Sequence, residues 1–394
     1  MIDTNTLVDQ FKSVYKESPK LISRAPGRVN LIGEHTDYNG GFVFPAAISF
    51  EMKIAASLRA DKTIHMYSVN FEQSFSFSLN AELTKCDKPY TWVNYFVAVI
   101  AQFVERGFDI PGMNIALSGD VPLGAGLSSS AAYEVCVASM LNYFCKSQID
   151  PAHIALLSQA AEHSKFVGVQ CGIMDQFISA LGKADHALMI DCHSLDYELV
   201  PFDSSKADIV IINSMKKRGL VDSEYNTRRA ECELGLQEMR KLTGKNYETI
   251  RHIPYEDFLA MESKLSTRDV CKRLRHNITE NMRVHDFGKA LANGDFELAG
   301  KLLCESHASL RDDFEVSCPE LDVITEIAAD IYGTFGCRMT GAGFGGCAVA
   351  LVKPEMTEEF QDVMFLEYKK RTKQQCITYV SKPCDGTNVT LLED

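Results

Sequence analysis

The chain has 394 residues, which suggests two domains, and its 46% hydrophobic and 24% charged residues are typical of a globular protein with a sizeable core. A disordered chain is therefore excluded. The formal net charge of −13 argues against a broad basic surface for phosphate backbones, so we expect no nucleic-acid partner.

The cysteines and the N-terminal residues indicate a cytoplasmic protein. Thirteen cysteines are present, and the closest two, Cys376 and Cys384, are too far apart for a C-x-x-C pair or a zinc motif. We expect them to be reduced thiols. Residues 1–20 lack a basic segment followed by an apolar one, and no run approaches the roughly eighteen apolar residues of a membrane span. We therefore expect no membrane association.

The order of the predicted elements indicates an α+β protein. A short amphipathic helix is expected first, and alternation in "SFSFSL" (74–79) predicts a half-buried strand. Further helices and strands are mixed in both halves, so we expect the α+β class and a division into domains 1–205 and 206–394. The expected elements are helices near 92–106, 130–145 and 151–165, strands at 112–119, 186–192 and 208–214, helices over most of 223–333, a glycine loop and strand within 337–352, a helix, and a strand at 376–381.

Residues 27–41, "GRVNLIGEHTDYNGG", concentrate charge in a glycine-rich segment. Arg28, Glu34, His35 and Asp37 lie within ten positions, in backbone that can adopt tight turns. Read alone, the three residues after Arg28 could form a metal site or a polar turn.

Residues 119–141, "GDVPLGAGLSSSAAYEVCVASML", have the layout of an anion site. Glycines allow backbone amides to approach a phosphate, and the following helix adds partial positive charge at its N-terminus. The serines could cap that helix or contact a phosphate or a metal. No Lys-Ser/Thr pair follows the glycines, so the segment is not a Walker A loop. The alternative is an ordinary capped helix after a tight turn.

Two further glycine segments carry weaker signals. "GAGFGG" (341–346) matches G-x-G-x-x-G, but the apolar run "CAVALV" follows and predicts a strand, whereas a dinucleotide fingerprint must open a helix. A strand-turn-strand loop fits better. In "GVQCGIMDQFISALG" (168–182), Asp175 is either a helix cap or a carboxylate in a partly desolvated cleft, where an arginine would hold it ionised. Spacing does not separate these two readings.

Five segments in chain order resemble the GHMP kinase superfamily and, within it, closely the galactokinase family: "GRVNLIGEHTDYNGG", "PLGAGLSSSAA", "CGIMDQ", "SEYNTRR" and "GAGFGGC". The resemblance implies a ribosomal-S5-like N-terminal domain and a ferredoxin-like C-terminal domain with the active site between them. It also implies ATP-dependent phosphorylation of the C1 hydroxyl of galactose, the first step of galactose catabolism by the Leloir pathway. ATP, Mg²⁺ and galactose are thus the expected ligands. The oligomeric state is left open, and a monomer is compatible with the sequence.

The resemblance also assigns the sugar and catalytic residues. Arg28 and Asp175 are similar to the family's catalytic pair, with the aspartate at the sugar C1 hydroxyl and the arginine stabilising both that carboxylate and the transferring phosphoryl group. The residues that match the family's sugar ligands are Glu34, His35, Asp37, Gly172 through its backbone, Asp175 and Tyr225.

The nucleotide and magnesium residues follow in the same way. Trp92 in "WVNY" resembles the adenine-side segment, with a buried core tryptophan as the alternative, and Ser130 and Glu162 resemble the magnesium ligands. An extra residue lies between Glu162 and Asp175 compared with the family spacing, so an exposed glutamate at a helix end is the alternative. The phosphate loop corresponds to Gly124, Ala125, Gly126, Leu127, Ser128, Ser129 and Ser130.

Two other functions remain open at this point. Kinases for N-acetylgalactosamine tend to have a second glycine where Ile173 stands, so "GIMDQ" favours galactose. Non-catalytic sensors that bind galactose and ATP lose part of the phosphate loop, whereas "SSSAA" (128–132), Arg28 and Asp175 are all present here.

Overall fold

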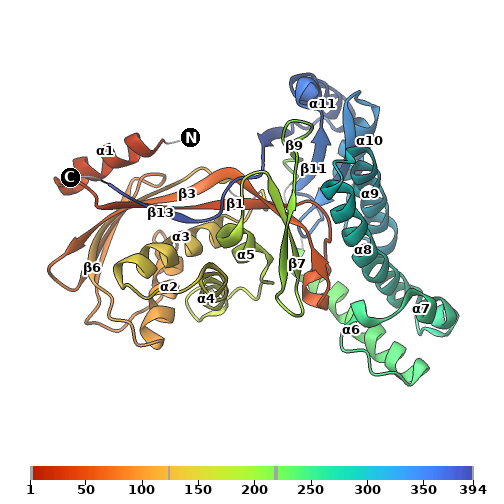
Figure 1. The fold of residues 1–394 in the computed structure, drawn as a ribbon, viewed down its shortest axis with the longest axis horizontal. Helices are drawn as coiled ribbons and strands as arrows, with labels where there is room; N and C mark the ends of the chain where they lie inside the picture. The colour runs from red at the N-terminus through yellow and green to blue at the C-terminus, as the bar shows by residue number, and fades with distance from the viewer. Residues whose placement is uncertain (1–2, 123–124, 217–220, 393–394) are drawn as a thin grey trace.

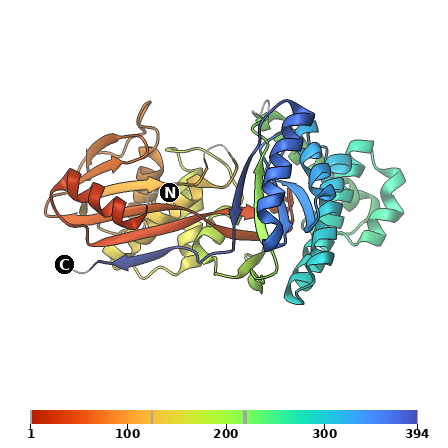
Figure 2. The same cartoon turned by 90° about the horizontal axis from the view of Figure 1, so that it is seen from above.

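The structure, a computed structural model, describes residues 3–122, 125–216 and 221–392. Its elements form two groups joined through the middle of the molecule, one built on the strands near the N-terminus and one on the later strands and helices (Figure 1). Seen from above, the two groups still lie side by side, and the long strand β1 (Leu21–Asn30) runs toward the junction (Figure 2). The functional residues described below gather at this junction.

A six-stranded sheet is the framework of the first group. Its strand order is β13-β1-β3-β6-β4-β5, and every pair is antiparallel except β4 with β6. β5 alternates between half-buried and exposed residues, as the pattern "SFSFSL" predicts. The other strands are β3 (Pro45–Arg59), β4 (Thr63–Ser68), β5 (Gln73–Ser78), β6 (Gly112–Gly119) and β13 (Asn388–Leu391).

Helices cover both faces of this sheet. Leu7 and Phe11 of α1 (Thr4–Tyr15) pack on one face, and four helices cover the other, where the main N-terminal core lies (Figure 1). The central helix, α3, buries residues around its whole circumference, which explains its long apolar sequence. The four helices are α2 (Val93–Glu105), α3 (Ser129–Phe144), α4 (Pro151–His163) and α5 (Met174–Leu181).

The second group is built on an antiparallel four-stranded sheet of order β10-β11-β9-β12. Alternate residues of β9 and β11 belong to two different hydrophobic clusters, one shared with the helices of this group and one shared with residues of the first group. Both faces are therefore covered, which explains the continuous apolar run "CAVALV". The strands are β9 (Asp208–Asn213), β10 (Thr334–Thr340), β11 (Cys347–Val352) and β12 (Ile377–Ser381).

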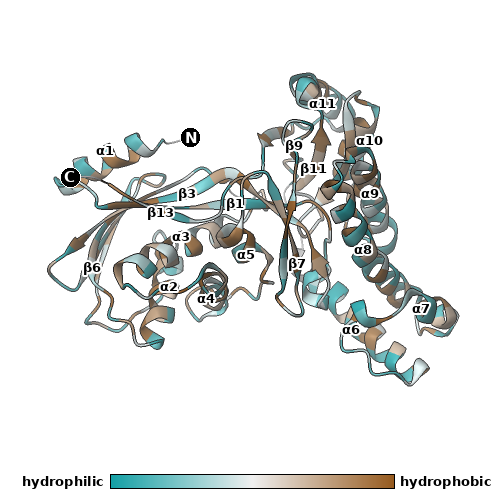
Figure 3. Cartoon of the chain, viewed as in Figure 1, coloured by the Kyte–Doolittle hydropathy of each residue, from teal (hydrophilic) through white to brown (hydrophobic). Residues whose placement is uncertain are grey.

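Helices, several of them long and largely polar, make up the rest of this second group, while its strands are mainly hydrophobic (Figure 3). They are α6 (Val221–Thr243), α7 (Tyr255–Met261), α8 (Arg268–Ala292), α9 (Phe296–Ser309), α10 (Pro319–Asp330) and α11 (Thr357–Thr372). A short sheet of β2 (Phe42–Val43), β7 (His186–Asp191) and β8 (Tyr197–Pro201) lies between the two groups.

The observed elements agree with the expected α+β order, including the strand-turn-strand arrangement of β10, residues 341–346 and β11. Several elements were not predicted, including β2, β8 and the two features that follow. A π-helical turn (Leu310–Phe314) extends α9, and β13 returns to the first sheet to pair with β1. The division near residue 205 stays a prediction.

Two expectations, one about the redox state of the cysteines and one about membrane association, can be compared with the described residues. No disulfide joins any of the cysteines in residues 3–122, 125–216 and 221–392, in line with reduced thiols. Within the same ranges, no helix combines the length and apolar composition needed to cross a membrane.

Candidate active site

A cavity of about 160 Å³ opens where β1, α5, α6 and the glycine loop 341–346 meet. Residues from four separate sequence motifs line it, although they are up to three hundred positions apart. They include Arg28, Glu34, His35, Asp37, Cys171, Gly172, Asp175, Tyr225, Gly341 and Ala342. The structure therefore brings together every residue that the sequence assigned to catalysis and to sugar binding.

Arg28 and Asp175, which both line this cavity, form a bidentate ion pair. Arg28 Nε and one terminal nitrogen each donate to a carboxylate oxygen of Asp175 at 2.8 Å, and the other terminal nitrogen donates to the carbonyl of Gly126 at 2.5 Å. Such a bidentate contact fixes the position of a carboxylate. Asp175 is the second residue of α5, whereas Ile173 is its N-cap, so the cleft carboxylate and not the helix cap is the correct reading.

Ser128 connects the phosphate loop to the same carboxylate. It stands at the N-cap position of α3 with a left-handed backbone (φ 61°), yet its side chain makes no capping hydrogen bond. Its hydroxyl donates to Asp175 instead. The ordinary capped-helix reading of this segment is therefore wrong.

The rest of the phosphate loop is anchored to β1. The carbonyl of Leu127 accepts the Arg28 backbone N–H at 3.1 Å, and the side chains of Ala125 and Leu127 are buried. Gly126 has φ 76°, a conformation that glycine adopts without strain. Gly124 lies outside the described residues.

Glu34 holds the sugar signature against the second group of elements. Its carboxylate accepts hydrogen bonds from Asn30 Nδ2 at 2.6 Å, from Arg338 of β10 at 2.7 Å, and from the backbone N–H of Gly341 at 2.6 Å. A carboxylate has about four acceptor positions, so three donors leave roughly one for a ligand hydroxyl. Arg338 is completely buried and Glu34 is 4% exposed.

His35 enters the cavity as a neutral imidazole. Burial lowers its pKa to about 3, with the neighbouring His276 and Arg338 adding to the effect. Its Nδ1 lies 3.0 Å from the Tyr38 hydroxyl, and its buried Nε2 has no hydrogen-bond partner among the described residues. The unpartnered nitrogen is therefore free to bind a ligand hydroxyl. The metal-trio reading of this segment has no support, because no group of three ligating side chains occurs among the described residues.

Asp37 and its neighbours complete the wall. The pKa of Asp37 is raised to about 6, mainly by burial and also by the charges of Glu34 and Asp175, while the hydrogen bond from the Tyr38 backbone N–H lowers it. A Cβ at Gly172 would overlap the Asp37 carboxylate, so only glycine fits there. The Tyr225 ring, from α6, lies 5.6 Å from the His35 ring, and burial raises the pKa of its phenol.

A second cavity, of about 290 Å³, lies on the other side of the phosphate loop. Its walls are mostly aromatic and apolar, from Phe71, Trp92, Tyr95 and Tyr133 among others, and Ser129 and Ser130 stand at its edge. Trp92 is 8% exposed and donates from its indole nitrogen to Gln73 Oε1 at 3.0 Å. Trp92 is therefore buried, as the core alternative expects, and it also lines the cavity, while its adenine-side assignment stays a prediction.

Glu162 is buried, so the reading of an exposed helix-end glutamate is wrong. It is 6% exposed and accepts hydrogen bonds from Gln176 Nε2 at 2.6 Å and from the Cys171 thiol at 3.2 Å. Burial raises its pKa, as does the charge of Asp175, while the hydrogen bonds from Cys171, Ser130 and Gln176 work in the opposite direction. Glu162 is therefore close to both Ser130 and Asp175, despite the extra residue in the intervening loop.

Sequence reasoning missed several residues that hold the site together. Arg338 gave a usable signal, because it is a single charge in an apolar strand just before the glycine loop. Asn30 and Tyr38 lie inside the sugar signature but drew no assignment. His276, Asn277, Glu280 and Asn281 of α8 contact the signature and gave no signal at all.

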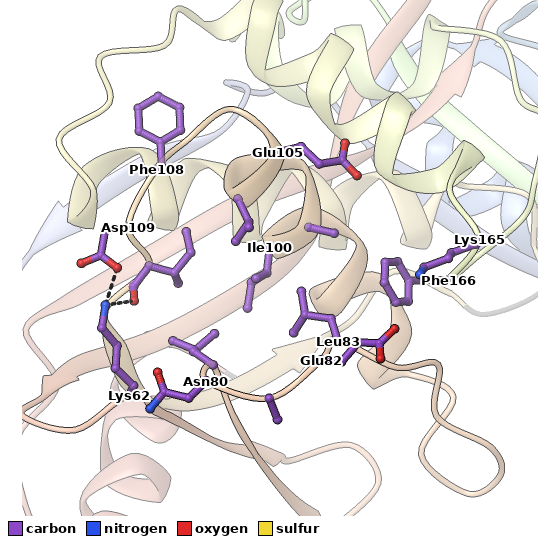
Figure 4. Close-up of a pocket in the computed structure, with 15 residues that line it drawn as sticks. Lys62, Asn80, Glu82, Leu83, Ile100, Glu105, Phe108, Asp109, Lys165 and Phe166 are labelled. Atoms are coloured by element: carbon purple, nitrogen blue, oxygen red, sulfur yellow. Dashed lines mark hydrogen bonds and ion pairs between the residues drawn. The ribbon is translucent and has the colours of Figure 1, made fainter.

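A wider hollow of about 470 Å³ lies away from these residues, between α2 and the segment that follows β5 (Figure 4). Its lining is largely apolar. Lys62 at its rim donates to Asp109 at 2.5 Å and to the carbonyl of Ile110 at 2.9 Å, so its charge is already compensated. None of the residues assigned from the sequence motifs lines this hollow.

Family signatures match three parts of the chain. The galactokinase galactose-binding signature matches residues 9–58, the GHMP kinases N terminal domain matches residues 94–183, and the GHMP kinases C terminal domain matches residues 289–368. The two cavities and the loops between them come mainly from the first two of these regions.

Solved structures extend the comparison to the whole chain. Lactococcus lactis galactokinase, complexed with galactose, is 36% identical, with a TM-score of 0.90 over 98% of this chain and 99% of that chain. Two mevalonate kinases share the fold alone. The Methanococcus jannaschii enzyme is 19% identical with a TM-score of 0.67 over 93% of this chain and 99% of that chain. The L. major enzyme is 15% identical with a TM-score of 0.60 over 94% and 97%.

These comparisons confirm the expected two-domain GHMP kinase fold and the expected phosphorylation of galactose, and they do not favour another sugar or a non-catalytic sensor. A kinase of this kind uses ATP as its co-substrate. With 36% identity to a galactokinase over almost the full length of both chains, the chain belongs to the galactokinase family of the GHMP kinases.

Proposed function

We propose that the chain transfers the terminal phosphoryl group of ATP to the C1 hydroxyl of α-D-galactose, the first step of galactose catabolism. One observation carries the proposal. Ser128 donates to Asp175 in the cavity of about 160 Å³, while the next two serines line the cavity of about 290 Å³. The two cavities therefore adjoin at the first turn of α3, where the positive end of the helix favours phosphate.

The smaller cavity suits a sugar. We assign contacts with sugar hydroxyls to Glu34, His35, Asp37, the Gly172 backbone and Tyr225. Their carboxylates, imidazole and phenol are fixed acceptors and donors, and a hydroxyl of the wrong stereochemistry would leave one of them buried without a partner. Such unpaired groups give strong discrimination between closely similar substrates.

Asp175 and Arg28 are the proposed catalytic residues. Asp175 orients the C1 hydroxyl and accepts its proton as the oxygen bonds to phosphorus. Arg28 holds the carboxylate in place through its two hydrogen bonds and offers positive charge to the transferring phosphoryl oxygens. Because phosphoryl transfer has a loose transition state, positioning and charge stabilisation contribute more than the strength of the base.

The larger cavity suits the nucleotide. Its aromatic walls, with Trp92, Tyr95 and Tyr133, offer flat apolar faces for the adenine ring. Ser129, Ser130 and the backbone of residues 124–128 are assigned to the phosphates. We further propose that the chain divides near residue 205, so that residues 1–205 supply most of this cavity.

Magnesium fits the residues between the two cavities. Mg²⁺ prefers oxygen ligands and is usually held by one or two protein groups together with substrate phosphates. Glu162 offers a buried carboxylate that has no lysine or arginine within ion-pair distance in the described ranges, and the Ser130 hydroxyl lies beside it. These two residues would hold the ion. When bound, Mg²⁺ would neutralise charge on the phosphate oxygens.

A coupled assay of ADP release tests the proposed function. Galactose, glucose, N-acetylgalactosamine and arabinose are compared at equal concentrations with magnesium-ATP. We expect the largest kcat/KM with galactose. Turnover with another of these sugars that equals or exceeds turnover with galactose would contradict the specificity, and no turnover with any sugar would contradict the kinase reaction itself.

A further inference from the structure

The segment 33–42, here called the sugar loop, leaves β1 and returns through β2 while carrying Glu34, His35 and Asp37 into the cavity. A buried loop of this kind must find partners for its backbone N–H and carbonyl groups. Several of those partners are side chains of α8, which comes from the second group of elements and lies more than 230 positions later in the chain. The four residues involved are His276, Asn277, Glu280 and Asn281.

His276 fixes the carbonyl that belongs to Glu34. Its Nε2 lies 3.1 Å from that carbonyl oxygen and its Nδ1 lies 2.9 Å from the Ser309 hydroxyl. A carbonyl can only accept, so Nε2 carries the proton and Nδ1 accepts from the serine. The ring is completely buried, and its orientation is set on both sides.

Glu280 fixes the start of the sugar loop. One of its oxygens accepts the backbone N–H of Gly33 at 3.0 Å and the Ser306 hydroxyl at 2.6 Å. The other accepts from Arg283 Nε at 2.7 Å. Gly33 has φ 90°, and a Cβ there would stand 2.5 Å from the carbonyl of Phe42, so the loop is narrow at this point.

The two asparagines fix the tip and the end of the sugar loop. Asn277 Oδ1 accepts from the side chain of Asn39 at 3.0 Å, and Asn281 Oδ1 accepts the backbone N–H of Phe42 at 2.8 Å. A Cβ on Gly41 would stand 2.5 Å from Asn281 Oδ1, so this glycine makes the close approach possible.

The positions 276, 277, 280 and 281 lie on one face of the helix, because residues three or four positions apart are neighbours along its surface. All four side chains are at most 6% exposed. The described hydrogen bonds of these side chains include none to Arg28, to Asp175 or to residues 125–130. This face, here called the positioning face, therefore contacts the sugar loop, which carries three of the proposed sugar ligands. Among the described residues, it makes no hydrogen bond to those assigned to the phosphate groups.

We propose that the positioning face of α8 sets the affinity for the sugar, by holding the sugar loop in its binding geometry, independently of the phosphoryl-transfer step. The inference rests on the proposed function, since it assumes that the sugar loop binds galactose. A binding group must be held within about half an ångström of its productive position, and hydrogen-bonded supporting residues provide that restraint. A sugar loop with one restraint fewer must be ordered by the sugar itself, which weakens binding without altering the Arg28–Asp175 pair.

Steady-state kinetics of Asn281→Ala test the inference. Removing the acceptor of the Phe42 N–H should raise the KM for galactose about tenfold, equivalent to about 1.4 kcal/mol. The KM for ATP and the kcat should stay within about threefold of the wild-type values. The reason is that the variant loses only binding energy that the ground state and the transition state share. Met282→Ala is the matched control, because Met282 is the next residue of the same helix and is 51% exposed. We expect it to behave as the wild type.

A variant on the loop side covers the case in which Asn281→Ala does not fold. Asn39→Ala removes the donor to Asn277 from a half-buried turn and should raise the galactose KM in the same direction. Thermal unfolding gives a second readout. The rise in Tm caused by saturating galactose should shrink in both variants, while the rise caused by a non-hydrolysable ATP analogue should remain.

The outcomes separate the two proposals. If the wild type turns over galactose and both variants match Met282→Ala in galactose KM, the positioning face has no such role. A loss of kcat at unchanged galactose KM, or an equal rise in the KM for ATP, also overturns the inference. If the wild type shows no galactose-dependent ADP release, it is the proposed function that fails, and the inference fails with it.

Discussion

The pair of Glu34 and Arg338 gives a sharp test of how the two halves of the molecule are joined. Glu34→Gln keeps the size and shape of the side chain but replaces one carboxylate oxygen with an amide NH₂. All three donors to Glu34, from Asn30, Arg338 and the Gly341 backbone, lie at 2.6–2.7 Å. At least one of these three donors would then face the new NH₂ group instead of an acceptor oxygen. Arg338 would also lose the only carboxylate within ion-pair distance in the described part of the chain.

The expected loss of stability is large because both side chains are buried. Arg338 is 0% and Glu34 is 4% exposed. Breaking a buried ion pair by removing one partner costs about 3–5 kcal/mol, because the remaining charge stays buried and uncompensated. Since the free energy of unfolding of a typical protein is only about 5–15 kcal/mol, such a loss would be a sizeable fraction of the total.

Urea unfolding of four proteins measures this effect: the wild type, Glu34→Gln, Arg338→Met and the double variant. We expect each single variant to lose about 3 kcal/mol or more of unfolding free energy. The double variant should lose less than the sum of the two by more than about 1 kcal/mol, because residues in direct contact are coupled.

Lys245→Met is the matched control. Lys245 and Asp257 form an ion pair with the same separation of 2.7 Å, but their side chains are 57% and 23% exposed. Removing it should lower the unfolding free energy far less, because solvent screens an exposed ion pair. If Glu34→Gln costs no more than this control, or if the two single losses simply add in the double variant, the reasoning from burial is refuted.

Three further predictions concern catalysis, metal and pH. Asp175→Ala should lower kcat about a thousandfold while ATP binding stays measurable by titration, and near-normal turnover would end its catalytic assignment. Glu162→Gln should move the magnesium dependence of the rate to higher concentrations, and an unchanged profile would leave Glu162 a structural residue. Burial lowers the pKa of His35 to about 3 and that of His276 to about 4, so the folded chain binds fewer protons than the unfolded chain below pH 6.5. Stability should therefore fall as the pH drops from 6.5 toward 4, with Asp37, whose raised pKa is about 6, opposing the trend. His276→Gln should flatten the decline in urea midpoint, and an unchanged slope would contradict this account.

The order of elements and the motif residues could be read from the sequence because their signals are local. Alternation in "SFSFSL" and the apolar run "CAVALV" depend only on neighbouring positions, and β5 and β11 were found in this way. The same holds for the sugar and phosphate motifs, whose glycines and charged residues stand close together. Family resemblance then placed Arg28 and Asp175 in one cavity.

The partners that hold these motifs could not be read in the same way. Arg338 contacts Glu34 from about three hundred positions away, and His276 reaches its carbonyl from α8. Such contacts depend on how two sheets and their helices pack, which no short window of sequence encodes. The target of the Ser128 hydroxyl could not be predicted either, because its direction follows from a left-handed backbone at a residue other than glycine, which the sequence does not indicate.

The return of β13 to the first sheet bears on how the chain acquires its structure during synthesis. Leu391 pairs with Leu21, the Thr387 N–H donates to the Ser179 carbonyl and the Gly386 N–H to the Gly182 carbonyl, so residues made after the whole second group of elements complete the sheet that contains β1. The early strands must therefore leave the ribosome with one edge of their sheet unpaired, and exposed edges invite association with other chains. Once residues 388–391 are made, β13 covers the free edge of β1 and becomes the short outer strand of the sheet.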